Sequence, residues 1–495
     1  MTEQFLISGG RPLNGRVNVS GSKNTAVALI PATLLTKETC ILRNVPAIED
    51  VERMIEIMRR LGAEVQWEDA DISEGHVSRR RSETTEDATA RRGGADDQRE
   101  DATPRGGGAD EEGSRRRPTE DATVSQRHLA RRRSEAPRSA HTLRITAREI
   151  DPARLDQAIV GRLRASVLFM GALLARAGST RIAYPGGDLI GARPLSTHFA
   201  ALEALGATIE ARDDHYAITA LRLRGVPLVL REFSVTATEN ALMAAALAQG
   251  KTTIHIAAAE PQVGALARFL NRMGARITGI GTHELTVQGV RRLGGAQARI
   301  MGDYIEAGTY AAAFAATRGK GIIGGVDPAM MELPILKLRE AGVPVTVVRN
   351  ELHIAPALTL KALPYPGIQT LPYPGFPTDL QAPFAVLATQ LNGVTAIQET
   401  LYEGRFKYLD ELCRMGAHAS VIDAHRALMT GPTPLYGTTI PSLDLRAGAT
   451  LVIAALVAEG RSVLKDAYNI DRGYERIEEK LAALGADIKR VSNDE

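Results

Sequence analysis

The sequence has few aromatic residues, few cysteines and no long apolar run. Phe, Trp and Tyr make up 4% of the 495 residues, which disfavours a surface that stacks on nucleic-acid bases. The two cysteines, Cys40 and Cys413, lie far apart on apolar segments, so we expect two buried thiols rather than a disulfide. No apolar stretch is long enough to span a membrane, and the N-terminus has no signal-peptide profile. We therefore expect a cytoplasmic protein with no membrane partner.

An excess of charge of either sign is also lacking. The chain has 60 Lys and Arg residues and 58 Asp and Glu residues, for a formal net charge of +2. Nucleic-acid binding needs a strong positive field, so this balance predicts no nucleic-acid partner. The length indicates two or more domains.

A helix-like segment that ends in glycine recurs six times, and an alternating, strand-like segment follows it each time. The glycines are Gly62, Gly206, Gly274, Gly342, Gly416 and Gly485. Glycine fits the left-handed position that closes a helix, and alternation with a period of two indicates a strand. Five of the six units share a period near 70, which is too long for a common solenoid. We expect an α/β fold with three such units in each of two domains.

The spacing between the first two glycines is longer by about 74 residues. The excess lies in residues 74–140, which have no aromatic residue and repeat Glu-Asp-Ala-Thr three times. Such a segment cannot bury enough apolar surface to offset the entropy of ordering it, so we expect a disordered insertion. A basic arm that binds RNA is the alternative, although acidic residues balance its arginines.

The loop of residues 185–193, PGGDLIGAR, combines three glycines with a carboxylate and a guanidinium. Glycines let a backbone approach a ligand closely. Asp188 can transfer a proton, and Arg193 can clamp an anion through its planar fork. A surface turn in which Asp188 caps the next element is the alternative.

Other candidate residues lie where elements begin. Lys23 follows a strand-like stretch and opens an apolar helical run, so an anion there would meet both a helix N-terminus and an ammonium. Ser22 as a simple helix cap is the alternative. Asp379 follows a proline turn, and locally a helix cap is again its simpler interpretation. Arginines beside small residues at element boundaries favour anion recognition, and they are Arg164, Arg405, Arg446 and Arg472.

Together these motifs resemble the enolpyruvyl transferases. The matching segments, in order, are GSKN (21–24), LRAS (163–166), PGGDLIGARP (185–194), FPTDLQ (376–381), the segment around Arg405, DLRAG (444–448) and IDRGYERIE (470–478). The resemblance implies an inside-out α/β barrel in each of two domains, with three repeats per domain and six in all. One domain would comprise residues 22–300, with the insertion, and the other residues 1–21 together with 301–495.

The resemblance also implies a reaction. The enolpyruvyl group of phosphoenolpyruvate would be transferred to the 3′-hydroxyl of UDP-N-acetylglucosamine, with release of phosphate and without a metal or organic cofactor. This is the first committed step of peptidoglycan precursor synthesis. Two alternatives are an enolpyruvyl transferase of specialised metabolism with a different nucleotide or sugar acceptor, and a catalytically weak scaffold protein. The sequence does not specify the oligomeric state.

By the same resemblance, Asp379 would be the base at the sugar hydroxyl, Asp188 the general acid, and Lys23 a third catalytic residue. Asn24 would contact the sugar nucleotide, and Ser234 and Val235 its diphosphate. The full set of substrate-binding residues would be Asn24, Arg164, Arg193, Ser234, Val235, Asp379, Leu401, Arg405, Arg446 and Arg472.

Four positions depart from the family pattern, and all are on the nucleotide side. Ser196 replaces an Asp, Glu232 a Lys, Thr236 a Gly and Tyr304 an Arg. The resemblance therefore supports the transfer reaction more strongly than it supports the identity of the acceptor.

Asp188 stands where many members of the family have the cysteine that fosfomycin alkylates. A carboxylate is a poor nucleophile for opening an epoxide, so we expect the protein to resist fosfomycin. Mass spectrometry of the intact protein after incubation with fosfomycin should show no adduct, whereas the Asp188→Cys control should gain one. An adduct on Asp188 would contradict this expectation.

Overall fold

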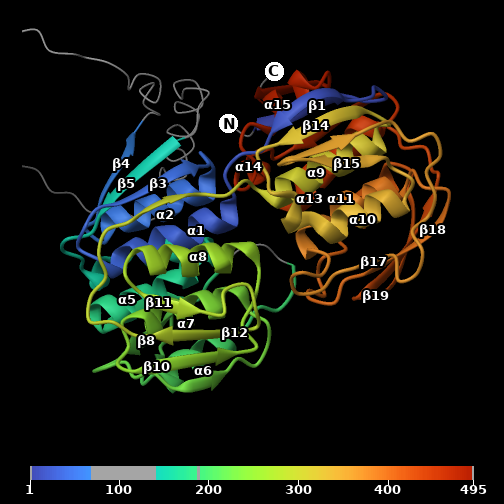
Figure 1. The fold of residues 1–495 in the computed structure, drawn as a ribbon. Helices are drawn as coiled ribbons and strands as arrows, with labels where there is room; N and C mark the ends of the chain where they lie inside the picture. Colours follow the sequence, from blue (N-terminus) through green and yellow to red (C-terminus); the bar gives the residue numbers. More distant parts are fainter. Residues whose placement is uncertain (1–2, 69–140, 187–189, 493–495) are drawn as a thin grey trace, which may run out of the picture. The chain divides into compact units, whose positions relative to one another are not determined.

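The structure is a computed structural model that describes residues 3–68, 141–186 and 190–492. The expected insertion and Asp188 therefore lie outside the described residues. Residues Met1–Asp69 and Ser139–Glu495 form one compact unit. The described part of this unit is a mixed α/β fold built on six sheets (Figure 1).

Each of the six glycines predicted to close a helix has a positive φ, between +88° and +108°. The helices before them are α2 (Glu49–Arg60), α6 (Ser196–Ala204), α8 (Pro261–Arg272), α10 (Glu332–Glu340), α12 (Tyr408–Arg414) and α15 (Ile477–Ala483). The strands after them are β4 (Glu64–Glu68), β7 (Thr208–Ala211), β11 (Arg276–Thr278), β15 (Val345–Val348), β19 (His418–Asp423) and β23 (Asp487–Ser492). The predicted order of helix, glycine and strand is confirmed in all six places.

Each of these strands forms one edge of a different sheet. Four-stranded sheets have the orders β13 (Gln297–Arg299)–β3 (Cys40–Val45)–β5 (His141–Thr146)–β4, β9 (Pro227–Val229)–β10 (Lys251–His255)–β12 (Glu284–Gln288)–β11, β2 (Asn14–Asn18)–β14 (Lys320–Gly324)–β16 (Glu351–Ile354)–β15, β17 (Ile368–Gln369)–β18 (Gly393–Gln398)–β20 (Arg426–Gly431)–β19, and β21 (Thr439–Pro441)–β22 (Arg461–Lys465)–β1 (Glu3–Ser8)–β23. The three-stranded sheet has the order β6 (Ser179–Ala183)–β8 (His215–Thr219)–β7. In each four-stranded sheet the first pair is parallel and the other two pairs are antiparallel.

Six apolar helices are largely buried. They are α1 (Lys23–Ala32), α5 (Phe169–Ala177), α7 (Val235–Ala246), α9 (Tyr304–Ala316), α11 (Thr378–Ala388) and α13 (Leu445–Val457). Helix α5 packs against α1 and α7, and α9, α11 and α13 pack against one another. Their small residues allow this close approach; a Cβ added at Gly308 of α9 would lie 2.4 Å from the side chain of Leu380 on α11. A helix that is apolar on all sides must be covered on all sides.

Shorter helices complete the fold. They are the 3-10 helices η1 (Thr33–Leu35), η2 (Pro152–Arg154), η3 (Arg164–Leu168) and η4 (Pro328–Met331) and the α-helices α4 (Gln157–Arg162) and α14 (Tyr468–Asp471).

The buried apolar side chains form two clusters. The first core contains side chains from residues 26–300, and the second core combines residues 5–19 with residues 304–488. Strands β1 and β2 at the start of the chain pair with strands from its C-terminal part, which puts them in the second core. The chain passes between the cores twice, and the two passages are hydrogen-bonded: the Ser22 amide donates to the Met301 carbonyl (2.7 Å), and the Asp303 amide to that of Ser20 (2.9 Å).

The two thiols differ in environment. Cys40 is buried and Cys413 is exposed, and both are free. The expected burial of Cys413 is therefore wrong. Helix α12 turns Leu409 and Leu412 inward, so the next residue along the helix, Cys413, faces solvent because successive helical residues point about 100° apart.

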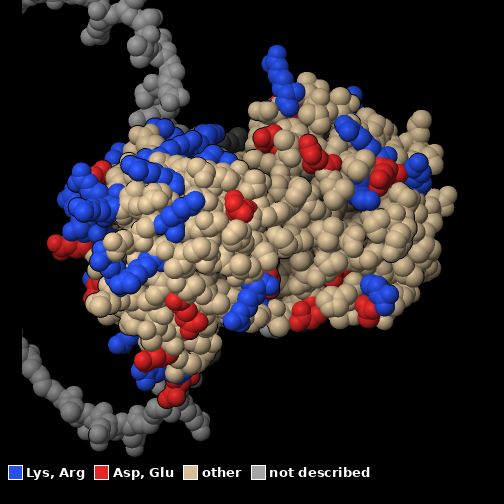
Figure 2. All heavy atoms as spheres, turned by 60° about the horizontal axis from the view of Figure 1, so that its bottom comes forward, with Lys and Arg blue, Asp and Glu red and all other residues tan. Residues whose placement is uncertain are grey.

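Charged side chains of both signs are scattered over the face drawn in Figure 2, and basic side chains gather most densely at its left. No helix in residues 3–68, 141–186 or 190–492 is both long enough and apolar enough to cross a membrane.

Candidate active site

The first residues of five buried helices meet at one cavity of about 570 Å³. Helices α1, α7, α9, α11 and α13 each contribute residues of their first turn to its lining. Helix N-termini carry partial positive charge and unpaired N–H groups, so their convergence creates a site for anions. Every described residue predicted to act in the site lines this cavity: Lys23, Asn24, Arg164, Arg193, Ser234, Val235, Asp379, Leu401, Arg405, Arg446 and Arg472.

Asp50, in the first turn of α2, pairs with two of these cations. Its carboxylate lies 2.6 Å from Lys23 Nζ and 3.1 Å from Arg472 Nε, and its side chain is only 2% exposed. Burial alone would raise the pKa of Asp50, but the charges of Lys23 and Arg472 outweigh it and hold the pKa below its ordinary value. The carboxylate therefore stays ionised and fixes both cations at the cavity.

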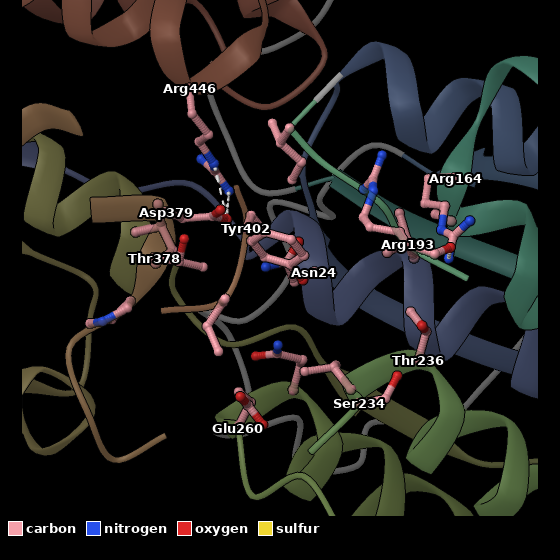
Figure 3. A pocket seen from close by; sticks show the side chains of 18 of the residues that line it. Asn24, Arg164, Arg193, Ser234, Thr236, Glu260, Thr378, Asp379, Tyr402 and Arg446 are labelled. Atoms are coloured by element: carbon pink, nitrogen blue, oxygen red, sulfur yellow. Dashed lines mark hydrogen bonds and ion pairs between the residues drawn. The ribbon is translucent and has the colours of Figure 1, made fainter. Parts of the chain in front are cut away.

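Asp379 pairs with two further cations. Arg405 Nη2 lies 2.6 Å from one carboxylate oxygen, and Nε and Nη2 of Arg446 both lie 3.1 Å from the other (Figure 3). Burial would raise the pKa of Asp379, yet the charges of Arg446 and Arg405 hold it far below its ordinary value. The simpler interpretation of Asp379 as a helix cap is wrong, because α11 has no side-chain cap and its N-cap residue is Pro377.

The caps of the other helices leave their functional side chains available. Ser22 accepts a hydrogen bond from the amide of Thr25 (3.3 Å) and so caps α1, as its alternative interpretation predicted. Asp444 likewise accepts from the amide of Arg446 (2.7 Å) and caps α13. Capping orders the first turn, which brings the side chain that follows to the cavity.

The glycine-rich loop approaches the cavity through its stems. The Gly186 amide donates to the Gly161 carbonyl (2.8 Å), and the Ile190 carbonyl accepts from the Gly404 amide (2.9 Å). Gly191 has a φ of +133°, and a Cβ there would lie 2.5 Å from the Glu403 carboxylate, so glycine is required. Three residues of this loop, Gly187, Asp188 and Leu189, lie outside the described residues.

Arg164 and Arg193 lie together on another side of the cavity (Figure 3). Arg164 Nη2 donates to the Arg193 carbonyl (2.5 Å). Burial and the neighbouring charge of Arg193 lower the pKa of Arg164 to about 10. Arg164 remains protonated at neutral pH, but the shift shows that a bound anion would be favoured there.

Three of the four departures from the family pattern line the cavity, and Ser196 does not. Thr236 Oγ1 lies 2.7 Å from His198 Nε2, and Glu232 accepts from the Thr197 hydroxyl (3.1 Å). Tyr304 is buried at the start of α9. Burial and the charge of Arg164 lower the pKa of His198 to about 3, so this imidazole is neutral at physiological pH.

Sequence reasoning missed several acidic and neutral polar residues of the cavity. Asp50 is one of them. Acidic residues are common in the first turn of a helix, so their presence at the start of α2 did not indicate a site. Others are Glu239 within α7 and Glu260 and Gln262 at the start of α8. A carboxylate inside the apolar run of α7 was the one available signal. In the described part of the chain, no three His, Cys, Asp or Glu side chains form a group that could hold a metal ion.

Replacing Asp50 with Asn should destabilise the protein and sensitise it to anions. Lys23 and Arg472, both largely buried, would lose the carboxylate of Asp50, which costs about 3 kcal/mol of unfolding free energy at neutral pH. Because the pKa of Asp50 is lowered, the difference from wild type should shrink only as the pH falls below about 4. Urea unfolding at several pH values measures this.

Inorganic phosphate can replace the missing charge, so it should raise the melting temperature of the Asp50→Asn variant more than that of wild type. The control Glu351→Gln removes an exposed partner of Arg16 and should change stability by less than about 1 kcal/mol. Equal stabilisation of Asp50→Asn and wild type by phosphate would show that Asp50 does not neutralise Lys23 and Arg472.

Comparison with known proteins gives the same family as the motifs. The family described as EPSP synthase (3-phosphoshikimate 1-carboxyvinyltransferase) matches residues 7–95 and 132–481. UDP-N-acetylglucosamine 1-carboxyvinyltransferases of Acidobacterium capsulatum and Coxiella burnetii are each 38% identical over 498 residues, covering 99% of this chain and 97% and 96% of theirs. The enolpyruvyl transferase NikO from Streptomyces tendae shares the fold, with a TM-score of 0.75 at 23% identity and 99% coverage of both chains. EPSP synthase from Acinetobacter baumannii has a TM-score of 0.64 at 16% identity, covering 99% of this chain and 100% of that one. The chain therefore belongs to the EPSP synthase family of enolpyruvyl transferases.

Proposed function

We propose that the protein transfers the enolpyruvyl group of phosphoenolpyruvate to the 3′-hydroxyl of UDP-N-acetylglucosamine and releases phosphate. The observation that carries this proposal is the cavity lined by helix N-termini and six cationic side chains, two of which pair with the carboxylate of Asp379. The names of relatives that are 38% identical over 99% of the chain support the acceptor. The reaction would serve peptidoglycan precursor synthesis in the cytoplasm.

We propose that the two cores correspond to two domains, residues 22–300 and residues 1–21 with 301–495. Each domain would be an inside-out α/β barrel of three repeats, with helices inside and sheets outside. The separate hydrophobic clusters support this division. The shared order of strands in the sheets and the buried helices support the repeats.

Phosphoenolpyruvate is an anion with a phosphate and a carboxylate, and the cavity offers matching charge. Guanidinium forks bind both groups bidentately. We propose that Lys23, Arg164, Arg193 and Arg472 bind the phosphate and the carboxylate of phosphoenolpyruvate. Arg405 and Arg446 complete the cationic site. Asn24 would contact the sugar nucleotide, Leu401 would add an apolar contact, and the N-terminus of α7 at Ser234 and Val235 would take the diphosphate.

The chemistry needs one base and one acid. As the acceptor oxygen forms its bond to C2 of phosphoenolpyruvate, Asp379 takes the hydroxyl proton and Asp188 gives a proton to C3. The tetrahedral ketal then loses a proton from C3 while the bond from C2 to the phosphate oxygen breaks, which forms the enol ether and free phosphate. Fixed positive charge stabilises the oxocarbenium–phosphate pair that develops in both steps.

The pairing of Asp379 suggests how the base gains strength. Its two arginines hold the pKa of Asp379 far below its ordinary value, which makes the free carboxylate a weak base. An anionic substrate competes for Arg405 and Arg446, and any loosening of those pairs raises the proton affinity of Asp379. Phosphoenolpyruvate would thus activate the base by binding.

Phosphate release tests the proposed function directly. Wild-type protein should release phosphate from phosphoenolpyruvate only when UDP-N-acetylglucosamine is present. Release only with a different nucleotide or sugar would show that UDP-N-acetylglucosamine is not the acceptor, and would favour an enzyme of specialised metabolism. No release with any nucleotide sugar would refute catalysis and favour a scaffold protein.

Asp379→Asn should abolish turnover, because the amide keeps the shape of the side chain but cannot take the hydroxyl proton. We expect a loss of at least about a hundredfold in kcat, with binding of UDP-N-acetylglucosamine still measurable by calorimetry. The control Asp423→Asn changes an exposed carboxylate paired with Arg426 and should leave kcat unchanged. Normal turnover by Asp379→Asn would show that Asp379 is not the base.

A further inference from the structure

One part of the cavity is lined by acceptor groups rather than by cations. Glu239 on α7, Glu260 directly before α8 and Gln262 on α8 all line it. The residues of Glu239 and Gln262 are 2% and 4% exposed. Among the residues that the structure describes, Glu239 Oε1, Glu260 Oε2 and Gln262 Oε1 are buried and have no hydrogen-bond partner.

Three unpartnered oxygens at one cavity are costly. A buried acceptor left without a hydrogen bond destabilises a protein by about 1–3 kcal/mol, and most buried polar groups therefore have a partner. The cost is recovered when a ligand brings hydrogen-bond donors to the same place. Glu239, Glu260 and Gln262 are therefore arranged for a ligand with several donors.

Burial disfavours negative charge in this cluster, which bears on the kind of ligand that it can bind. Burial and the neighbouring charge of Glu260 raise the pKa of Glu239 well above its ordinary value, which favours the neutral form of this side chain. Burial also raises the pKa of Glu260. Acceptor oxygens suit the O–H donors of hydroxyl groups and give phosphate oxygens no hydrogen bond.

The cluster and the proposed base line the same cavity, and Tyr304 lines it with them. Beyond the effect of burial, the charges of Glu260 and Asp379 both raise the pKa of the Tyr304 phenol. The Tyr373 amide, on the loop that leads to α11, donates a long hydrogen bond (3.5 Å) to Glu260 Oε1. In the view of Figure 3, Glu260 lies on the side of Ser234 and away from Arg164 and Arg193.

We propose that Glu239, Glu260 and Gln262 form a subsite that binds hydroxyl groups of the acceptor's sugar. This inference rests on the proposed function, in which the reacting hydroxyl lies at Asp379 and the diphosphate at the start of α7. A sugar between those two points presents its remaining hydroxyls to the cluster. The subsite selects a hydroxyl-rich acceptor, whereas the cations bind the anionic groups of both substrates.

Glu260→Gln is the sharpest test, because it keeps the shape of the side chain. The amide oxygen must stay with the Tyr373 N–H, so an NH₂ group replaces the unpartnered acceptor. Calorimetry should show at least about tenfold weaker binding of UDP-N-acetylglucosamine, while the Kd values of UDP and phosphoenolpyruvate stay within about twofold of wild type. Gln262→Met removes the second acceptor at similar volume and should give the same selective loss.

Glu284→Gln is the matched control. It changes an exposed carboxylate that pairs with His255 and should leave all three affinities unchanged. Melting temperatures close to that of wild type would show that the variants fold.

Each other outcome counts against the subsite. Equal losses for UDP and UDP-N-acetylglucosamine, or no loss in Glu260→Gln, would overturn it. It would also fall if wild type bound UDP-N-acetylglucosamine no more tightly than UDP.

The phosphate-release assay separates this failure from that of the proposed function. Suppose that wild type releases phosphate with UDP-N-acetylglucosamine, and that Glu260→Gln still binds UDP-N-acetylglucosamine more tightly than UDP by the same factor as wild type. This result overturns the subsite and leaves the proposed function standing. A selective loss of sugar affinity without any release by wild type supports the subsite and overturns the function.

Discussion

Positive charge is concentrated at the cavity, and two carboxylates keep it there. The N-termini of five buried helices and six cationic side chains meet in one place, an arrangement that would repel itself without internal counter-ions. Asp50 balances Lys23 and Arg472, and Asp379 balances Arg405 and Arg446. These pairs fix the side chains before any ligand arrives, so binding an anion requires little reorganisation.

One of these pairs, Asp50 with Arg472, joins parts of the chain that belong to different cores. Asp50 is in a helix that packs on the first core, whereas Arg472 follows α14 beside the second core. Asp303, where the chain passes between the cores, accepts hydrogen bonds from the amides of Lys23 (3.1 Å) and Ile305 (2.9 Å) and so fixes the starts of α1 and α9 together. An anion at the cavity therefore contacts groups held by both cores.

The cavity also separates two kinds of recognition. Cations and helix N-termini on one side suit phosphates and carboxylates, and the oxygens of Glu239, Glu260 and Gln262 suit neutral donors. Asp379 lines the same cavity as both groups. A substrate with a charged end and a hydroxyl-rich end would find complementary groups at each.

Much of the fold follows from local signals in the sequence. Glycine after an apolar helical segment predicts the left-handed residue that closes the helix, and all six such glycines adopt it. Alternation predicts the strand that follows, since its period reflects which side chains are buried. The same local signals found Ser22 as a helix cap, and motifs together with the resemblance to the enolpyruvyl transferases found eleven residues that line the cavity.

Tertiary structure decided what depends on distant partners. Asp379 looks like a helix cap in its own segment and becomes an ion-pair partner only because α13 brings Arg446 beside it. Asp50 and Arg472 are 422 residues apart in sequence, and no local pattern links them. Cys413 is exposed because α12 packs through the face that carries Leu409 and Leu412. The sequence by itself determined where six helices end and the next strands follow, because the left-handed glycine that closes a helix is a local feature of the backbone. Packing alone decided which charges pair and which stay without a partner, because burial and electrostatic energy depend on every side chain nearby.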